Sequence, residues 1–446
     1  MRKDSKISRE IKRTKIETSF TAKELTNYSG LLPLKKFADK MGIEKSLNEE
    51  IGLRLHHNYQ YETGTILMAI TLGLLCGQDR ISKIEKFTYD PLVQKLLKIK
   101  DKIDEDTIIN RIKRFSMCQT KQFMDLISTQ SNTIHQKLGT EKDILDIDST
   151  VQTVYGNQEG AEKGYNPENK NRKSYHSLLG FLGSTKECVG SWLRPGNSYT
   201  ANNSVGFIKE ILGRITEEIK ELIVRADSGF FDDALIEELE TSKRNLQYII
   251  KVKLKNMRQM LLKQDWESIP EMEDMQMSEF YYRCESWKSA RRFVAVRKRI
   301  REIKDGVLFP HTEYQYFCYV TNIEESPLYL HKFYGDRKTL CGESENWIEA
   351  LKNQLFAGLM LTNKFWANES LLLCSVLGYN LSIWMRKLTD TQSWREEPAT
   401  FRSWFIQLAG KIVKSGRKIY LKIYKAFYYK QRWEQIDKAI DELLFI

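Results

Sequence analysis

The stretch DILDIDSTVQTVY, residues 143–155, decides how this chain is divided. Before it, LPLKKFADKMGIEKSLNEEI and DEDTIINRIKRFS carry apolar positions at helical spacing among many basic residues. From Lys142 onward, DILDIDSTVQTVY, YHSLLGFL and CVGSWLR are short runs rich in residues that favour strands, separated by a loop with glycine and asparagine. The stretch therefore marks the change from a helical region to three predicted strands.

Helices and strands are predicted to alternate after these three strands. FIKEILGRITEEIKEL predicts a helix, ELIVRAD a buried strand, FDDALIEELETS a helix and LQYIIKVK a further strand. Three strands in a meander followed by this alternation predict a mixed α/β sheet covered by helices. The same strand order is typical of the ribonuclease-H-like fold, which we therefore predict for the core.

The composition is that of a folded, basic chain with more than one domain. Its 446 residues exceed the usual size of a single domain, and a hydrophobic fraction of 41% is enough to bury a core. Lysine and arginine number 70 against 59 acidic residues, a formal charge of +11. Such a charge favours a polyanionic partner, either nucleic acid or an anionic membrane surface.

Neither a signal peptide nor a membrane span is predicted. The basic first residues are not followed by an apolar segment, and the apolar run at 66–76 is too short to cross a bilayer. The seven cysteines are dispersed without a CxxC pair, which favours a reducing cytoplasm over a disulfide framework or a zinc ribbon. We therefore expect a cytoplasmic protein whose partner is nucleic acid, with no membrane association.

The predicted elements divide the chain into five segments. Residues 1–140 are expected to be a helical, basic DNA-binding region, and 141–255 the first part of the core. Residues 256–330 are expected to be an inserted antiparallel β domain, with RRFVAVRKRIRE and YQYFCYVTN as its clearest strands. Residues 331–390 would hold the final core helices, and 391–446 a basic segment for DNA contact or dimerisation.

Acidic residues stand at the ends of two predicted buried strands. Asp148 closes ILDID, and Asp227 closes ELIVRAD just before Ser-Gly. Phosphodiester cleavage and strand transfer use two metal ions about 4 Å apart, and Mg²⁺ prefers a few carboxylate oxygens. Asp146 shares the face of Asp148 by strand alternation, so it either lines the same site or supports it. The two strand ends thus predict part of a metal site.

A third carboxylate is expected on the late helix ENWIEALKNQLF. Glu343, Glu345 and Glu349 are the candidates. Glu345 and Lys352 are seven residues apart, which is two turns of an α-helix, so the carboxylate could hold metal while the ammonium reaches a phosphate. Glu349 lies between them on nearly the same face and is the alternative to Glu345.

These residues stand in longer motifs. The runs LDIDSTVQTVYGNQEGAEKGYNPENKNRKSYHSLLGFL, SWLRPGNSYT and VRADSGFF resemble the DDE transposases of bacterial insertion sequences. The resemblance covers about residues 143–352 and is closest to the branch with a β-strand domain between the second Asp and the Glu. By this resemblance Asp148 is the first acid, in Asp-x-Thr, Asp227 is the second, and Glu345 with Lys352 matches the helix signature.

The third motif departs from the family pattern. The family often has an arginine four residues before the glutamate, where this chain has Cys341. Arg337, in the preceding turn, is the residue that could contact DNA in its place.

The resemblance implies a transposase that nicks transposon ends and joins the freed 3′-hydroxyl to target DNA. It implies two Mg²⁺ ions, with Mn²⁺ tolerated, Asp148 bridging both and Asp227 and Glu345 holding one each. It also implies a homodimer that pairs two double-stranded terminal inverted repeats. Two alternatives remain from the residues alone, a nuclease of the same fold and a catalytically silent DNA-binding regulator.

The loop at 156–173 is predicted to contact the DNA backbone. It has three glycines and four basic residues close to Asp148, namely Lys163, Lys170, Arg172 and Lys173. It is not a Walker loop because no GK[ST] closes it, and the alternative is a plain flexible turn.

A second basic stretch lies near the C-terminus. Residues 398–433 contain nine basic residues and no acidic one, interleaved with aromatic residues, a mixture that suits phosphate contact and base stacking. Lys414, Arg417 and Lys418 flank Gly416 in KSGRK, a predicted turn that would present them outward. The alternative is a packed element whose lysines are merely solvated.

Overall fold

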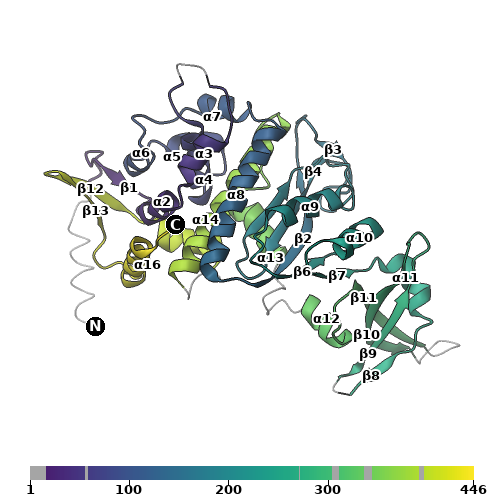
Figure 1. The fold of residues 1–446 in the computed structure, drawn as a ribbon. Helices are drawn as coiled ribbons and strands as arrows, with labels where there is room; N and C mark the ends of the chain where they lie inside the picture. The colour runs from purple at the N-terminus through teal and green to yellow at the C-terminus, as the bar shows by residue number, and fades with distance from the viewer. Residues whose placement is uncertain are drawn as a thin grey trace.

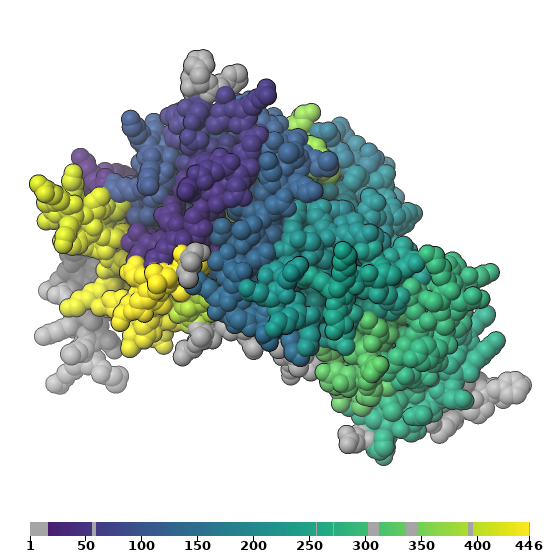
Figure 2. Space-filling view, in the orientation of Figure 1, coloured from purple at the N-terminus to yellow at the C-terminus, as the bar shows by residue number. Residues whose placement is uncertain are grey.

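The computed structural model describes residues 17–55, 59–270, 272–303, 311–335, 344–390 and 396–445. In these ranges a long mixed sheet lies beside a layer of helices and continues beyond it (Figure 1). Figure 2 shows the residues between about 250 and 335, teal to green, projecting as a lobe from the rest of the molecule. The predicted mixed α/β class is confirmed.

Helices from both ends of the chain form one layer. The N-terminal helices are α2 (Leu31–Lys40), α3 (Ile43–Glu50), α4 (Thr63–Leu75), α5 (Ile81–Phe87), α6 (Pro91–Leu97), α7 (Glu105–Ile112) and α8 (Met117–Leu138). The C-terminal ones are α14 (Phe365–Thr389), α15 (Pro398–Phe401), the π-helical turn η3 (Arg402–Ile406) and α16 (Lys430–Glu442). Every residue of α4 is buried because its sequence is apolar on all sides, and it packs against α14.

The core sheet has the predicted strand order. Its strands are β2 (Lys142–Thr153), β4 (Lys173–Leu182), β5 (Cys188–Trp192), β6 (Glu221–Ala226) and β7 (Leu246–Lys251). They lie in the order β5-β4-β2-β6-β7, with β4 antiparallel to both its neighbours and β6 parallel to β2 and β7. Helices α9 (Ser204–Arg214) and α10 (Asp233–Thr241) connect the parallel strands. This is the ribonuclease-H-like arrangement.

The two faces of β2 contact different layers. Leu145 and Ile147 pack with α9 and α10 in one buried cluster. Asp146 and Asp148 alternate with them and share a face with Phe181 and Leu179 of β4, which pack among the helices of the terminal layer. The acids of β2 therefore face the side of the sheet that the late helices cover.

The strands of the insertion continue the core sheet. They are β8 (Glu267–Ile269), β9 (Met272–Tyr282), β10 (Arg291–Ile303) and β11 (His311–Thr321), with helices α11 (Leu254–Leu261) and α12 (Pro327–Gly335) beside them. Strand β11 pairs antiparallel with β7 over Tyr319–Thr321. Together with β3 (Glu162–Lys163), which pairs with β4, core and insertion make one sheet of ten strands.

A separate three-stranded sheet carries the C-terminal basic residues. It consists of β1 (Leu25–Thr26), β12 (Gly410–Ser415) and β13 (Lys418–Ile423). Gly416 has a φ of +61° in the turn between β12 and β13, a left-handed conformation that favours glycine. The turn predicted at KSGRK is therefore present. Over the described ranges, no helix combines the length and apolar character that a bilayer crossing requires.

Candidate active site

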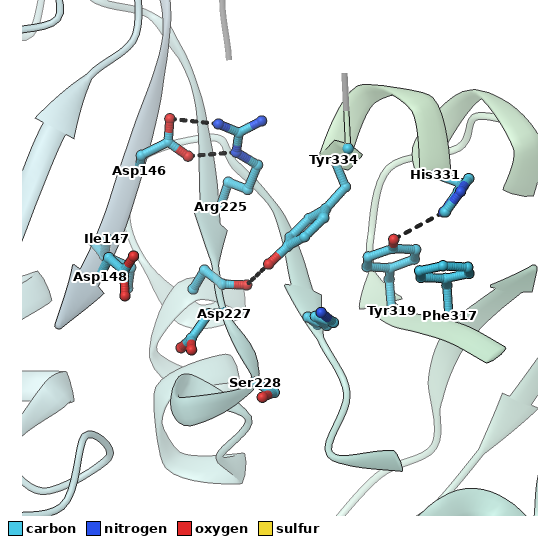
Figure 3. Close-up of a pocket in the computed structure, with 13 residues that line it drawn as sticks. Asp146, Ile147, Asp148, Arg225, Asp227, Ser228, Phe317, Tyr319, His331 and Tyr334 are labelled. Atoms are coloured by element: carbon cyan, nitrogen blue, oxygen red, sulfur yellow. Dashed lines mark hydrogen bonds and ion pairs between the residues drawn. The ribbon is translucent and has the colours of Figure 1, made fainter. Parts of the chain in front are cut away.

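A cavity of about 360 Å³ opens beside the end of β6 and the middle of β2 (Figure 3). Asp148, on β2, and Asp227, directly after β6, both line it. Strands β2 and β6 are adjacent and parallel, and the two acids directly follow the paired residues Ile147 and Ala226. We expected Asp148 to end its strand, but β2 continues to Thr153 because its pairing with β4 extends that far. The structure thus brings together the first two predicted acids.

Asp146 is engaged by Arg225. The Arg225 Nε lies 2.5 Å from Asp146 Oδ1, and its Nη2 lies 2.8 Å from Oδ2, with both side chains buried. Burial raises the pKa of Asp146 to about 6 in spite of this ion pair. Both oxygens of Asp146 are occupied, so its position favours a supporting role beside Asp148. Asp148, half-buried, accepts the Ser149 backbone N–H at 2.6 Å.

Asp227 is held by the short turn η1 (Ser228–Phe230), which follows it. Its Oδ1 accepts the Gly229 backbone N–H at 2.9 Å. A Cβ at Gly229 would lie 2.9 Å from that same oxygen and from Cγ2 of Thr200, so only glycine fits this close approach. Burial raises the pKa of the Asp227 carboxyl, against the effect of the Gly229 N–H and of the Lys251 charge. A desolvated carboxylate in this state is well suited to a cation.

Helix α12 of the insertion forms the opposite wall of the cavity (Figure 3). Tyr334 donates a hydrogen bond to the Ala226 carbonyl at 3.1 Å, and Arg225 Nη1 donates to the Phe333 carbonyl at 3.2 Å. Beside them His331 lies 3.0 Å from the Tyr319 hydroxyl. These contacts attach α12 to the residue that precedes Asp227.

Sequence reasoning missed the lining contributed by Lys251, Phe317, Tyr319, His331 and Tyr334. Lys251 could have been found from the sequence. It ends the apolar run LQYIIK in the same way that Asp227 follows the run ELIVRA, and the two runs form neighbouring parallel strands. The aromatic residues had none, since only the folding of α12 against β6 brings them to the cavity.

The helix of the predicted third acid, α13 (Ser344–Glu349), packs against β2. Its buried Trp347 contacts Phe181, the residue paired with Asp146, at a ring-centroid distance of 5.9 Å. Glu345 therefore belongs to a helix on the face of the sheet that carries Asp146 and Asp148. Its side chain, like Glu343 and Arg337, lies outside the described residues, whereas Glu349 is exposed.

The helix does not continue to Lys352 as the regular α-helix we expected. Ala350–Gln354 form a π-helical turn, η2, in which the Leu355 N–H donates to the Ala350 carbonyl at 3.2 Å. The wider turn buries Leu351 and Leu355 together, which explains the departure from α-helical geometry. Lys352, at the centre of this turn, is half-buried beside Gly358.

The loop residues predicted to contact DNA lie between the carboxyl end of β2 at Thr153 and the start of β4 at Lys173. Lys163 pairs in register with Lys173 across β3 and β4, which places two like charges opposite each other. Lys173 also donates to Asn157 Oδ1 at 3.0 Å, and Arg172 lies over the Tyr155 ring. Lys163, Lys170 and Arg172 are exposed.

The hairpin residues are not brought to the cavity. Lys414, Arg417 and Lys418 are exposed on the hairpin of β12 and β13. The hairpin and the insertion lie at opposite ends of the molecule (Figure 1).

No set of three or more His, Cys, Asp or Glu side chains is placed to hold a metal ion within the described ranges, which exclude the Glu345 side chain. The two aspartates nevertheless fit a hard divalent cation. Both offer carboxylate oxygens to one cavity, and both follow paired positions of adjacent strands.

A sheet in the order β5-β4-β2-β6-β7, with one acid on β2 and another directly after β6, defines the ribonuclease-H-like class. The family model described as Transposase DDE domain group 1 matches residues 8–444. The chain therefore belongs to this DDE transposase family, as the motifs around Asp148 and Asp227 predicted.

A comparison with solved structures found similarity to three transposase complexes. The chain is similar to the piggyBac transposase in a synaptic complex with hairpin DNA, with 14% identity, a TM-score of 0.45 and coverage of 85% of this chain and 80% of that one. It is also similar to the Mos1 transposase in a paired-end complex with the left transposon end, with 12% identity, a TM-score of 0.18 and coverage of 44% and 60%. A third structure is the Mos1 mariner paired-end complex with Mn, at 13% identity, a TM-score of 0.18 and coverage of 55% and 71%. No curated protein matches the sequence.

Proposed function

We propose that this transposase cuts DNA at the ends of a bacterial insertion sequence and joins the freed 3′-hydroxyl to target DNA. The observation that carries the proposal is the convergence of Asp148 and Asp227 on one cavity, within a chain of the DDE transposase family. The two aspartates follow paired positions of neighbouring parallel strands, so cations held by both could act on a single phosphate.

In this proposal Asp148, Asp227 and Glu345 hold divalent cations, Mg²⁺ by preference and Mn²⁺ as a substitute. Bound ions of this kind activate the attacking oxygen and stabilise the leaving oxygen of the phosphodiester. The chain's own contribution is positional. The Asp146–Arg225 pair joins β2 to the end of β6, and Tyr334 fixes α12 over Ala226, beside Asp227.

The DNA partner is proposed to be double-stranded, comprising terminal inverted repeats and a target. Supporting observations are the charge of +11 and the exposed basic residues of the 156–173 loop and of the hairpin. The piggyBac transposase was solved as a synaptic complex. A homodimer that pairs two transposon ends is proposed for this chain as well. The proposed location is the cytoplasm.

The test uses purified protein, Mg²⁺ and a supercoiled donor plasmid that carries the inverted repeats flanking the gene. Products in which donor ends are joined to target DNA are expected. Cleavage without joining would instead identify a nuclease, and a mobility shift without cleavage would identify a regulator. A donor with scrambled repeats is the matched control, and it should remain uncut.

A further inference from the structure

A second hollow of about 530 Å³ adjoins the active-site cavity. It lies between α11 and β11 of the insertion, and Lys251 and Phe317 line both hollows. The two hollows therefore adjoin at these residues, and a chain-like ligand that follows the second would reach the first past Lys251.

Three basic side chains follow this groove. Lys251 ends β7, and Lys255 and Arg258 stand one turn apart on α11. In the part of the chain that the structure describes, none of the three has an ion-pair partner, and Lys255 and Arg258 are exposed. Several other bases of the insertion make ion pairs with acidic side chains, namely Lys288, Arg291, Arg292, Arg299 and Arg301. What distinguishes Lys251, Lys255 and Arg258 is that all three line the groove.

The opposite side of the groove is aromatic. Tyr314, Tyr316 and Phe317 of β11 line it, with the rings of Tyr314 and Tyr316 centred 6.3 Å apart. The Arg297 guanidinium lies 4.2 Å from the centre of the Tyr314 ring and 4.4 Å from that of Trp266, so it supports Tyr314 by stacking. Strand β7 pairs with β11 only over Tyr319–Thr321, so within the described residues the earlier part of β11 presents an open edge to α11.

We propose that this groove binds an unpaired DNA strand that leads into the active-site cavity. Lys251, Lys255 and Arg258 would contact its phosphates, and Tyr314 and Tyr316 its bases. In a duplex the base faces are covered by their neighbours, so aromatic side chains can stack only on bases that are unpaired. Among the described residues, basic side chains without ion-pair partners follow one side of the groove, and aromatic rings follow the other. This arrangement fits one strand of DNA better than a duplex, whose two backbones need a wider surface. The inference rests on the proposed function and adds a substrate segment to it.

The test measures binding of a short thymidine oligonucleotide by fluorescence anisotropy over a range of salt concentrations. Protein with Asp148→Asn is used throughout, so that the result does not depend on cleavage. Lys255→Ala with Arg258→Ala should make the slope of log affinity against log salt shallower by about 1.4, because each phosphate contact on a single strand contributes about 0.7. Tyr314→Leu should weaken binding about tenfold without changing the slope.

The matched control is Lys288→Ala with Arg301→Ala, which removes two exposed but paired bases of the same insertion. Its affinity and slope should equal those of the parent, and thermal unfolding of each variant checks that the fold is kept. An unchanged slope in the Lys255–Arg258 variant would overturn the inference. So would an equal loss for duplex and single strand, since the groove would then contact duplex backbone. If the groove variants change single-strand binding as expected but the protein does not join DNA, only the proposed function would be contradicted.

Discussion

The carboxylate of Asp146 and the guanidinium of Arg225 form a two-point ion pair between directly paired positions of β2 and β6. Each of these residues lies two positions before an acid of the active site, Asp148 on one strand and Asp227 on the other. Arg225 also donates to the Phe333 carbonyl, so the same side chain connects the core strands to α12. The spacing of the two acids therefore depends on a buried pair that never has to contact DNA.

Removal of one partner of this pair should be costly. Arg225→Met leaves the Asp146 charge buried without compensation, and we expect a loss of about 3–5 kcal/mol in the free energy of unfolding, measured by urea denaturation. Arg225→Met combined with Asp146→Leu should recover most of that loss, because no isolated charge remains. A double variant as unstable as the single one would show that packing, and not charge, dominates here.

Replacement of either Asp148 or Asp227 should abolish cleavage but preserve DNA binding. Asp148→Asn and Asp227→Asn each remove a proposed metal ligand, whereas phosphate contacts elsewhere on the protein are unaffected. Cleavage of terminal-repeat DNA in Mg²⁺ and the mobility shift of the same DNA are the two measurements. Cleavage at a rate near that of wild type in either variant would contradict the assignment.

The third acid can be identified by comparing three variants. Glu345→Gln should be as severe as the aspartate changes, whereas Glu343→Gln should be mild. Glu349 is exposed, and Glu349→Gln should also retain cleavage. An inactive Glu349→Gln beside an active Glu345→Gln would place the metal ligand one turn further along α13.

The hairpin of β12 and β13 should contribute sequence-independent binding to duplex DNA. Changing Lys414, Arg417 and Lys418 together to alanine should make the salt slope shallower by about 2.7, at about 0.9 for each phosphate contact. Terminal-repeat and unrelated DNA should lose affinity equally, since phosphates carry no sequence information. Lys438→Ala, on α16 and paired with Glu442, is the control. A loss confined to terminal-repeat DNA would mean that the hairpin reads bases.

Glu369 should make stability depend on pH. It is buried in α14, its Oε2 has no hydrogen-bond partner in the described structure, and burial raises its pKa to about 8. Between its unfolded pKa, about 4.3, and this value, the folded protein keeps a proton that the unfolded chain loses, so stability falls as pH rises.

Glu369→Gln removes this titration. The free energy of unfolding of this variant, relative to that of wild type, should therefore increase from pH 5.5 to pH 8. The increase should be on the order of 3 kcal/mol. Urea denaturation at the two pH values measures it, with the exposed Glu218→Gln as the control. A gain that stays constant with pH would show that Glu369 is ionised in the folded protein throughout.

The core strands were predictable because each is a short buried run, and buried runs are visible as apolar, β-branched sequence. The same property revealed Asp148 and Asp227, since a carboxylate at the end of such a run interrupts the apolar pattern. Strand alternation left Asp146 and Asp148 both open, and the resemblance assigned Asp148. The pairing of Asp146 with Arg225 was not predictable, because it depends on the register of β2 and β6.

Features that arise from long-range contacts were also not predictable. Tyr334 reaches Ala226 only because α12 folds back over β6, and the π-helical turn at Ala350 reflects how Leu351 and Leu355 pack. The glutamate of α13 was predicted from spacing and resemblance, and its assignment stays a prediction.

Strand β7 is hydrogen-bonded on one side to β6, which leads to Asp227, and on the other to β11, which carries the aromatic side of the groove. A rotation of the insertion away from the core would have to break the pairing of β7 with β11. While that pairing holds, the separation between the acids and the groove is fixed. If the groove takes a single strand, the protein itself sets how many nucleotides must be unpaired before a phosphate can reach the acids.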